Sequence, residues 1–269
     1  TSLSLIDDIR VSAVHNSSRL NGSLEYLGRR RETSPYLGRY NGISVVVDRK
    51  KVSIMTNHTL LRARVEKVTR LLNASQNIKE LRIPPCLGWA YTQRRVDECS
   101  QSFEYCAYDI VYSFGGMHVI SLQDMLQERI KLPLHKRFDV AKSLARSILY
   151  LHTAEWLHKG IRSSNVVFFT DRLLNESDDR ASKQSDREFL AKIDLPYLVG
   201  FEYSRINSHD EKTEHMTDGF DNNLYRHPDV QGEPETGPDS YLGDSPRFSK
   251  NHDIYSLGVV LLELGLYKR

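Results

Sequence analysis

The chain has 269 residues, of which 39% are hydrophobic and 27% are charged. This composition is typical of a soluble globular protein, and the length suffices for one large domain or two small lobes. Because the 37 basic and 35 acidic residues are interspersed and the net charge is +2, we do not expect nucleic acid as the principal partner. No run approaches the ~18 apolar residues of a membrane-spanning helix, and the first residues lack the features of a signal peptide, so neither membrane insertion nor secretion is expected.

Cysteine usage indicates the cellular compartment. Cys86, Cys99 and Cys106 are odd in number and lack the paired spacing of a zinc site, so neither a disulfide framework nor a zinc cluster is predicted. Reduced thiols are typical of intracellular proteins. We therefore expect a cytoplasmic protein.

The first 38 residues are rich in Ser, Asn, Gly and Arg and are expected to form an N-terminal extension. Backbone amides can wrap the phosphates of a nucleotide only where side chains are absent, which is why such loops carry closely spaced glycines. The glycines in and next to this region form no G-x-G-x-x-G motif and are expected to be turn residues. They are Gly22, Gly28, Gly38 and Gly42.

Residues 42–51 are predicted to form a β-branched strand after a turn. Because side chains alternate along a strand, Val46, Asp48 and Lys50 share one face. Lys50 could therefore point at a phosphate from the end of the strand. A solvated lysine at a basic strand end is the alternative.

Residues 60–72 carry apolar residues every three or four positions, which predicts an amphipathic helix. Glu66 is the only acid in this segment. It could pair with Lys50 of the preceding strand, or with Arg62 or Arg70 one helical turn away on the surface. The sequence leaves both pairings open.

Two further strands and a break in the structure follow. Residues 87–91 and 103–114 are predicted to be the last strands of a small mixed region, and the glycines at 115–116 are expected to form a hinge. Ser121 precedes an apolar-periodic run and predicts a helix start. The apolar pattern of residues 133–152 predicts a longer helix with one buried face.

A basic, polar loop, W-L-H-K-G-I-R-S-S-N at residues 156–165, follows this helix. It resembles the catalytic loop of protein kinases, H-R-D-L-x-x-x-N, in which the Asp accepts the substrate hydroxyl proton and the Asn holds a magnesium ion. His158 and Asn165 stand at the matching separation of seven residues, but Gly160 occupies the position of the Asp. The loop thus resembles a phosphotransfer loop without its catalytic base.

Three further motifs follow in the order of a protein kinase catalytic domain. They are P-Y-L-V-G-F-E-Y-S-R at 196–205, Y-R-H-P-D at 225–229 and D-I-Y-S-L-G at 253–258. The resemblance covers about residues 40–269. More narrowly, the chain resembles the degenerate kinase-like domains of filamentous fungi, which commonly follow a HeLo-type prion-inhibition-and-propagation domain in proteins linked to incompatibility and programmed cell death.

The resemblance implies a two-lobed α+β protein-kinase-like fold. We expect an N-terminal extension at 1–38, a small β-rich N-terminal lobe at 39–114 and a truncated, mainly helical C-terminal lobe at 115–269. The segment 254–266 is apolar nearly all round and is expected to be a buried helix. Because the remaining helices of a complete lobe do not follow it, we expect either a fragment or a surface that something else covers.

The resemblance also indicates which functional positions have changed. Gly200, Phe201 and Glu202 stand where kinases have D-F-G, so the carboxylate that coordinates magnesium is replaced by hydrogen and Phe201 keeps a structural position. His158 is implied to be a hydrogen-bonded bracket rather than a base. Asp253 is implied to accept hydrogen bonds from the backbone of the catalytic loop, with a plain helix cap as the alternative.

Few groups that could hold ATP or magnesium are left. Lys50 and Glu66 would be the ion pair that positions ATP, and Arg162 would keep a positive charge near a γ-phosphate or pair with an acid that follows it. Asn165 alone is a poor magnesium site, because the ion prefers several carboxylate and phosphate oxygens. Asp194 could replace the missing ligand only if the chain bent unusually. We therefore expect no required cofactor, ATP and magnesium being the ones that the resemblance would supply.

Three polar segments are expected to be loops. Residues 171–188 are a solvated insertion, residues 206–224 stand at the place of an activation loop, and residues 231–250 contain several Pro, Gly and Asp. The second segment is either a target for another kinase or merely a flexible loop. Its candidate phosphorylation sites are Ser208, Thr213 and Thr217.

We expect a catalytically impaired kinase homologue, a pseudokinase, that acts through contacts with other proteins in fungal signalling or self-recognition. A positioned base contributes ~10²–10⁴-fold to a rate, and phosphoryl transfer also depends on a metal ion, so the loss of both argues against turnover. The first alternative is an active atypical Ser/Thr kinase that transfers phosphate from ATP with Lys50, Glu66, Arg162 and Asn165. The second is a nonfunctional remnant whose truncation prevents stable folding.

Overall fold

The computed structural model describes residues 19–28, 35–52, 58–95, 103–171, 184, 187–191, 193–207, 223–231 and 247–267. Most of the expected N-terminal extension and most of the three predicted loops lie outside these residues. The same holds for Cys99 and for the candidate phosphorylation sites Ser208, Thr213 and Thr217.

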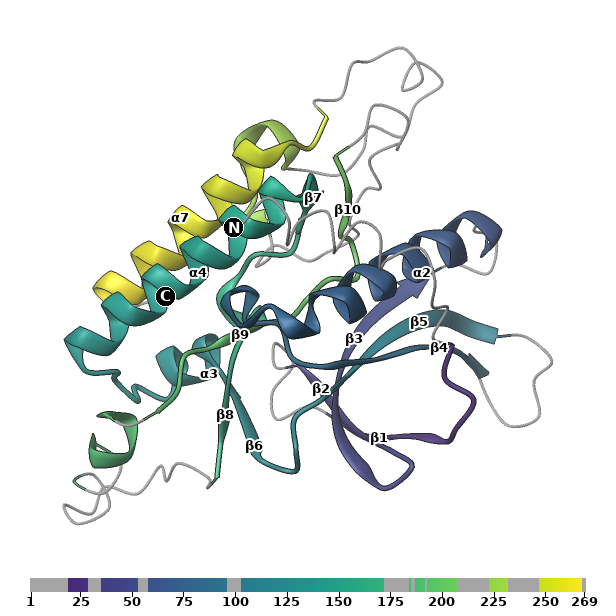
Figure 1. Cartoon of the computed structure of the whole chain (residues 1–269), viewed down its shortest axis with the longest axis horizontal. Coiled ribbons are helices and arrows are strands. Elements are labelled where there is room, and N and C mark those ends of the chain that lie inside the picture. The colour runs from purple at the N-terminus through teal and green to yellow at the C-terminus, as the bar shows by residue number, and fades with distance from the viewer. Residues whose placement is uncertain are drawn as a thin grey trace.

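A five-stranded antiparallel sheet forms the N-terminal part of the fold, with the spatial order β1-β2-β3-β5-β4 (Figure 1). Strand β3 is central, because it pairs with β2 along one edge and with β5 along the other. The strands are β1 (Leu24–Gly28), β2 (Tyr36–Tyr40), β3 (Ile43–Val52), β4 (Cys86–Arg95) and β5 (Phe103–Ser113).

Strand β3 confirms the strand predicted from the β-branched run, and it is covered on both faces. Val46 belongs to the main hydrophobic core, whereas Val45 and Val47 pack with Val111 in a second, small cluster. Because side chains alternate, Asp48 lies on the same face as Val46 and points into the main core. A buried acid in the middle of a valine-rich strand requires hydrogen-bond donors around it.

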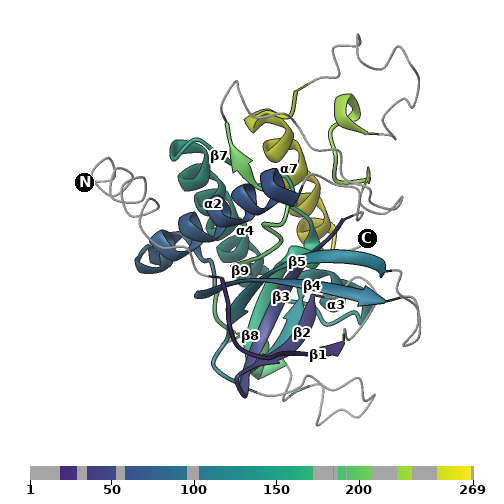
Figure 2. The same cartoon turned by 90° about the vertical axis from the view of Figure 1, so that its right-hand side faces the viewer.

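Helix α2 (His58–Ala74) crosses one face of this sheet (Figures 1 and 2). Its predicted apolar stripe is at most 4% exposed and packs into the main core. Burying such side chains stabilises a fold by roughly 1.5–3 kcal/mol each, which holds α2 against the strands. The stripe consists of Leu61, Val65, Val68 and Leu72. Two short 3₁₀ turns, η1 (Ser75–Asn77) and η2 (Lys79–Leu81), follow α2.

The second part of the chain is mainly helical. Helices α4 and α7 lie side by side and pack against each other, while two small sheets, β6-β8-β9 and β7-β10, hold the connecting segments (Figures 1 and 2). The elements are β6 (His118–Ser121), α3 (Leu122–Gln127), α4 (Leu134–Thr153), β7 (Trp156–Leu157), η3 (Ser163–Asn165), β8 (Val166–Thr170), β9 (Tyr197–Leu198), β10 (Arg205–Ile206), η4 (Pro228–Val230) and α7 (Lys250–Leu266).

The helix start predicted at Ser121 is confirmed by the cap of α3. The Ser121 hydroxyl accepts the Asp124 amide at 3.0 Å, and the Asp124 carboxylate accepts the Ser121 amide at 3.1 Å. Both residues are buried, so this capping box satisfies amide groups that water does not reach.

Helix α7 differs from its prediction, because it is buried on one face rather than nearly all round. Val260 and Leu264 face α4 and the core, whereas Ile254, Leu262 and Leu266 are 54–63% exposed. An all-round apolar sequence does not encode which face the neighbouring helix takes. Within the described part of the chain, helix α4 packs against one side of α7.

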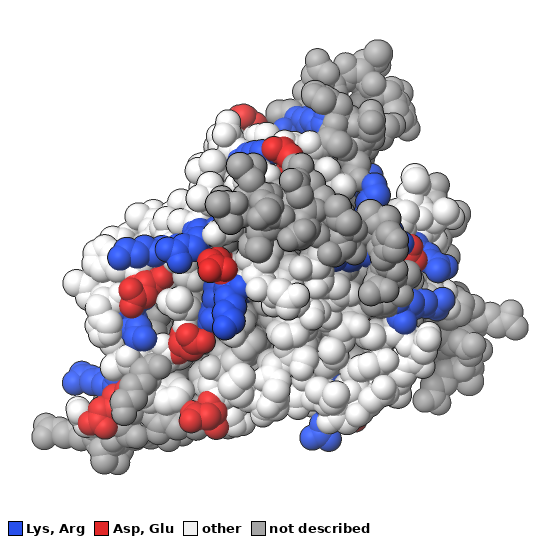
Figure 3. Space-filling model, viewed as in Figure 1, with Lys and Arg blue, Asp and Glu red and all other residues white. Residues whose placement is uncertain are grey.

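The arrangement, a β-rich N-terminal region followed by several helices, is compatible with a two-lobed kinase-like fold. One core cluster continues from the sheet into the helices, while the boundaries at 38 and 114 stay predictions. No helix in the described ranges combines the length and the hydropathy needed to cross a bilayer. On the face shown in Figure 3, basic and acidic side chains are intermixed.

Candidate functional site

The loop at 156–165 is held in place by a carboxylate from α7. Asp253 is fully buried, and its two oxygens accept the backbone amides of His158 and Lys159, each at 2.8 Å. The Nε2 atom of His152, at the end of α4, lies 3.1 Å from the same carboxylate. Lys159 has a φ of +65°, so these two amide contacts fix a residue in the left-handed region. The structure therefore places Asp253 against the backbone of the loop.

The ring of His158 is buried within the 156–165 loop and contacts the loop's own backbone. Its Nδ1 accepts the Gly160 amide at 3.1 Å, and its centroid lies 4.3 Å from that of Phe201. Burial lowers the pKa of His158 to about 4, although the nearby Asp253 carboxylate acts in the opposite direction. The ring is therefore neutral at pH 7, with its proton on Nε2 because Nδ1 is an acceptor. The described contacts of the ring are thus with the backbone of the loop and with Phe201.

Gly160, Asn165 and Gly200 contact one another closely. The Asn165 side-chain amide donates to the Gly160 carbonyl at 2.7 Å. A Cβ atom on Gly200 would lie 1.9 Å from Nδ2 of Asn165, and a Cβ atom on Gly160 would lie 2.6 Å from the Gly200 carbonyl. Gly200 also has a φ of +91°, which side chains rarely adopt. The two positions at which a kinase carries its carboxylates are thus filled by neighbouring atoms.

Asp48 of β3 is the site residue that sequence reasoning missed. Its Oδ2 atom accepts the amides of Gly200 at 2.6 Å and Phe201 at 2.9 Å, and the Tyr112 hydroxyl at 2.7 Å. Burial raises the pKa of Asp48, whereas these hydrogen bonds and Arg162 oppose the rise. The available signal was an acid on the inward face of a valine-rich strand, where an unsatisfied carboxylate is strongly disfavoured.

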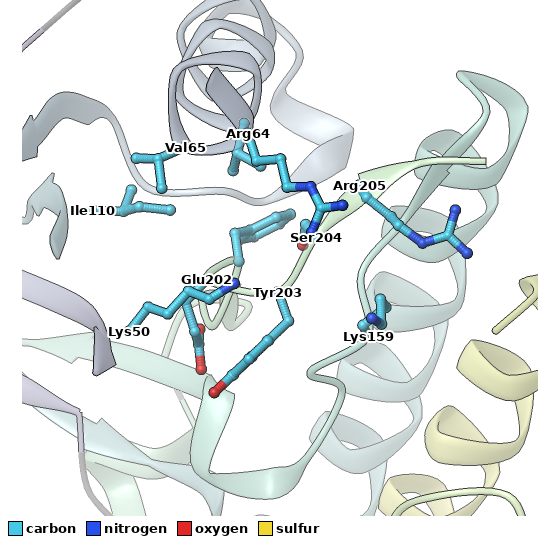
Figure 4. A pocket seen from close by; sticks show the side chains of 11 residues that line it. Lys50, Arg64, Val65, Ile110, Lys159, Glu202, Tyr203, Ser204 and Arg205 are labelled. Carbon is cyan, nitrogen blue, oxygen red and sulfur yellow. The ribbon is translucent and has the colours of Figure 1, made fainter. Parts of the chain in front are cut away.

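Lys50 and Glu66 are not brought together. Lys50 is 6% exposed, and its Nζ lies 4.7 Å from the ring centroid of Tyr203 (Figure 4). Glu66 instead accepts a hydrogen bond from Arg62 at 2.9 Å, which is the surface pairing that the sequence also allowed. The phase of the helix explains this result, because Val65 faces the cavity beside Lys50 and the next residue is rotated by about 100°.

Arg162 takes the second of the two roles considered for it, whereas Asp194 lies away from the role considered for it. The Arg162 guanidinium lies 3.6 Å from the Glu202 carboxylate, so it pairs with an acid that follows it in the sequence. Asp194 is 70% exposed at its side chain and pairs with Arg82 at 2.9 Å. The chain therefore makes no bend that would bring Asp194 to the position of Gly200.

The cavity beside Lys50 is small and is lined by charged side chains (Figure 4). Its volume is about 10 Å³, close to the minimum that one water molecule requires. Sites for ligands of nucleotide size measure roughly 300–1,000 Å³. The charged residues around it are Lys50, Arg64, Lys159, Glu202 and Arg205.

Replacing Gly200 by Ala tests the packing around Asn165. The added methyl group would overlap the Asn165 side chain, and the alanine would have to keep the left-handed φ of residue 200. We therefore expect Gly200→Ala to lower the free energy of unfolding by about 3 kcal/mol in denaturant titrations. Gly116→Ala is the matched control, because Gly116 has a φ of +80° but nothing within 4 Å of its Cβ position; its loss should be about 1 kcal/mol. Equal losses in the two variants would contradict the close contact with Asn165.

The buried His158 predicts a pH-dependent stability. Because its folded pKa is about 4 and its unfolded pKa about 6.5, its contribution is complete above pH 6.5 and is lost as the pH falls toward 4. A shift of this size corresponds to about 3 kcal/mol. We expect unfolding titrations at pH 7 and pH 4.5 to show this loss in the wild type and a smaller one in His158→Asn.

Subtracting the pH-dependent loss of His158→Asn from that of the wild type removes the contributions of other titrating groups. One of these groups is Asp48, whose raised pKa favours the folded state as the pH falls. The control is His135→Asn at an exposed position of α4, which should keep the wild-type pH slope. A slope in His158→Asn equal to that of the wild type would show that another group carries the effect.

Comparison with known proteins adds one distant relative. No family model matches the chain. It is 23% identical over 207 residues to Kinase suppressor of Ras A of Caenorhabditis elegans. The aligned region covers 75% of this chain and 24% of that protein. The chain thus spans about a quarter of the length of the relative it matches. Together with the arrangement of sheet and helices, this similarity supports a kinase-like domain.

Proposed function

We propose that the chain is a kinase-like domain that has lost phosphotransfer and acts by contacts with other proteins. The observation that carries this proposal is the packing of Asn165 against Gly200, because it leaves no space for a carboxylate where a kinase holds its metal. The proposal concerns the described site and treats the partner as unknown.

The chemistry that remains at this site is insufficient for ordinary turnover. Gly160 has no group that could orient a hydroxyl nucleophile, and a positioned base supplies ~10²–10⁴-fold. Asn165 directs its amide nitrogen at the Gly160 carbonyl, an arrangement in which the side chain serves the loop. One amide oxygen is a weak magnesium site in the absence of carboxylates.

The position of Asp48 also supports the proposed loss of phosphotransfer. Its carboxylate lies against the amides of Gly200 and Phe201, next to the place where a kinase would bind phosphates. A negative charge at this position repels phosphate groups and removes amide donors that could have bound them. We infer that ATP and magnesium are not required by this domain.

The alternative function is an active atypical Ser/Thr protein kinase. It needs Lys50 paired with Glu66, and Arg162 directed at a γ-phosphate. The pairs Arg62–Glu66 and Arg162–Glu202 argue against both conditions in this conformation. A change of conformation on nucleotide binding would be needed to restore them.

We further propose a role in intracellular signalling or self-recognition in a fungus, in the cytoplasm. Two features support it: the likeness of the motifs to degenerate fungal kinase-like domains, and the similarity to a protein whose name connects it with Ras. The partner would be another protein. Nothing in the described residues identifies that partner.

Binding of nucleotide is the direct test of the proposed loss of catalysis. A ligand at 100 times its Kd stabilises a protein by about 2.7 kcal/mol, which raises Tm by roughly 5–10 °C for a domain of this size. We expect no such rise with millimolar ATP and magnesium, and no transfer of labelled phosphate to a protein substrate mixture. An active kinase domain measured in parallel is the positive control.

A rise in Tm with magnesium and ATP, together with phosphate transfer abolished by Lys50→Met or Asn165→Ala, would overturn the proposal. Transfer that survives both substitutions would indicate a contaminating kinase. A rise in Tm with ATP alone and no transfer would leave a nucleotide-binding pseudokinase, which corrects the inference about ATP and keeps the loss of catalysis.

A further inference from the structure

A group of metal-ligating side chains lies outside the site described above, where η4 meets the start of α7. It consists of His227, Asp229 and His252, and one ligand atom of each lies within 4.8 Å of the others. The first two belong to the H-P-D part of the Y-R-H-P-D motif, and the third stands in the first turn of α7. Neither the kinase resemblance nor the proposed function gives these three side chains a role.

The two imidazole rings are positioned by neighbouring backbone and rings. Nδ1 of His227 accepts the Asp229 amide at 3.2 Å and lies 3.3 Å from its carboxylate. Nδ1 of His252 accepts the Ser249 amide at 3.0 Å. The ring centroids of His227 and His252 are 5.2 Å apart, and Tyr255 and Phe248 pack edge-on against them.

The exposure of the three residues suits a site with an open position. His252 is 6% exposed, whereas the side chains of His227 and Asp229 are 33% and 57% exposed. Within the described residues, the hydrogen bonds of both rings run through Nδ1, which leaves both Nε2 atoms available to a ligand. In the described part of the chain, no Lys or Arg pairs with the Asp229 carboxylate, which lies 3.3 Å from Nδ1 of His227.

We propose that His227, Asp229 and His252 bind a divalent transition-metal ion of the zinc class. Two imidazole nitrogens and one carboxylate oxygen are ligands that zinc prefers, and a water molecule would complete a four-coordinate shell. The ion would join the 223–231 segment to the first turn of α7. This joint already contains hydrogen bonds, from the Ser256 hydroxyl to the Tyr225 carbonyl at 2.7 Å and from the Tyr225 hydroxyl to the Glu263 carboxylate at 2.8 Å.

Closing the site around an ion requires small movements. Ligand atoms about 2.0–2.1 Å from a tetrahedral zinc are roughly 3.3 Å apart. One ligand atom of each residue lies within 4.8 Å of the others, so these atoms must approach by about 1.5 Å at most when each ring binds through the nitrogen that belongs to this set. Rotations of the exposed His227 and Asp229 side chains provide such a movement.

The proton positions must also change. A ring that binds zinc through Nε2 carries its proton on Nδ1, and Nδ1 can then no longer accept an amide. A single hydrogen bond of this kind contributes little to stability compared with the bonds from a zinc ion to its ligands, so a three-ligand site outweighs the loss of both contacts.

Zinc binding to the purified chain tests this inference. We expect equilibrium dialysis to give one zinc ion per chain at micromolar free zinc, a rise in Tm that a chelator reverses, and no rise with magnesium. Asp229→Asn is the first variant, because this exposed residue can change without unfolding the protein. We expect Asp229→Asn and His227→Asn to weaken zinc binding at least tenfold.

His118→Asn is the matched control, since this exposed histidine lies on β6 and should leave zinc binding unchanged. Cobalt provides a second readout, because tetrahedral Co²⁺ absorbs strongly in the visible range and the band should disappear in Asp229→Asn. Absence of stoichiometric zinc in the wild type would overturn the inference. So would wild-type affinity in Asp229→Asn and His227→Asn, which would place the ion elsewhere.

Discussion

The carboxylate of Asp48 is the contact on which the geometry of the site depends. It extends from the central strand of the sheet and accepts the amides of Gly200 and Phe201, so the N-terminal sheet sets the path of the segment that follows β9. A buried carboxylate is strongly unfavourable unless donors surround it. The Tyr112 hydroxyl is the third donor to this carboxylate.

The closed packing of the loop follows from that joint. With the Gly200 amide directed at Asp48, the Gly200 carbonyl lies against Gly160 and its α-carbon against the Asn165 side chain. Asn165 then donates to the Gly160 carbonyl. The Gly200 amide, the Gly160 carbonyl and the Asn165 side-chain amide are thus each directed at another group of the same protein.

Part of this fold was predictable from the sequence, because periodicity and capping are local. The β-branched run gave β3, the apolar stripes gave α2 and α4, and Ser121 gave the start of α3. Motif spacing also brought the right segments together, since the His158 loop, the Gly200 segment and Asp253 do meet.

What the sequence did not predict depends on the relative placement of elements. Whether Glu66 faces Lys50 is decided by the rotation of α2 on the sheet, and periodicity fixes that rotation only to within a residue, so Val65 rather than Glu66 lines the cavity. Which side of α7 is exposed was not predicted for a similar reason, because an apolar residue can face a neighbouring helix or solvent. Asp48 was visible as an inward acid, but its partners are 64, 152 and 153 residues away in the sequence.

The absence of acids at 160 and 200 and the presence of one at 48 are physically connected. A carboxylate on residue 200 would lie close to Asp48, because the Gly200 amide is 2.6 Å from its oxygen. Two such charges about 4 Å apart repel by roughly 4 kcal/mol at the effective dielectric near a protein surface, unless a metal ion lies between them. In a kinase, the carboxylate at the position of residue 200 instead binds magnesium. With glycine at both positions, this chain keeps one buried carboxylate, that of Asp48, which accepts the backbone amides of Gly200 and Phe201.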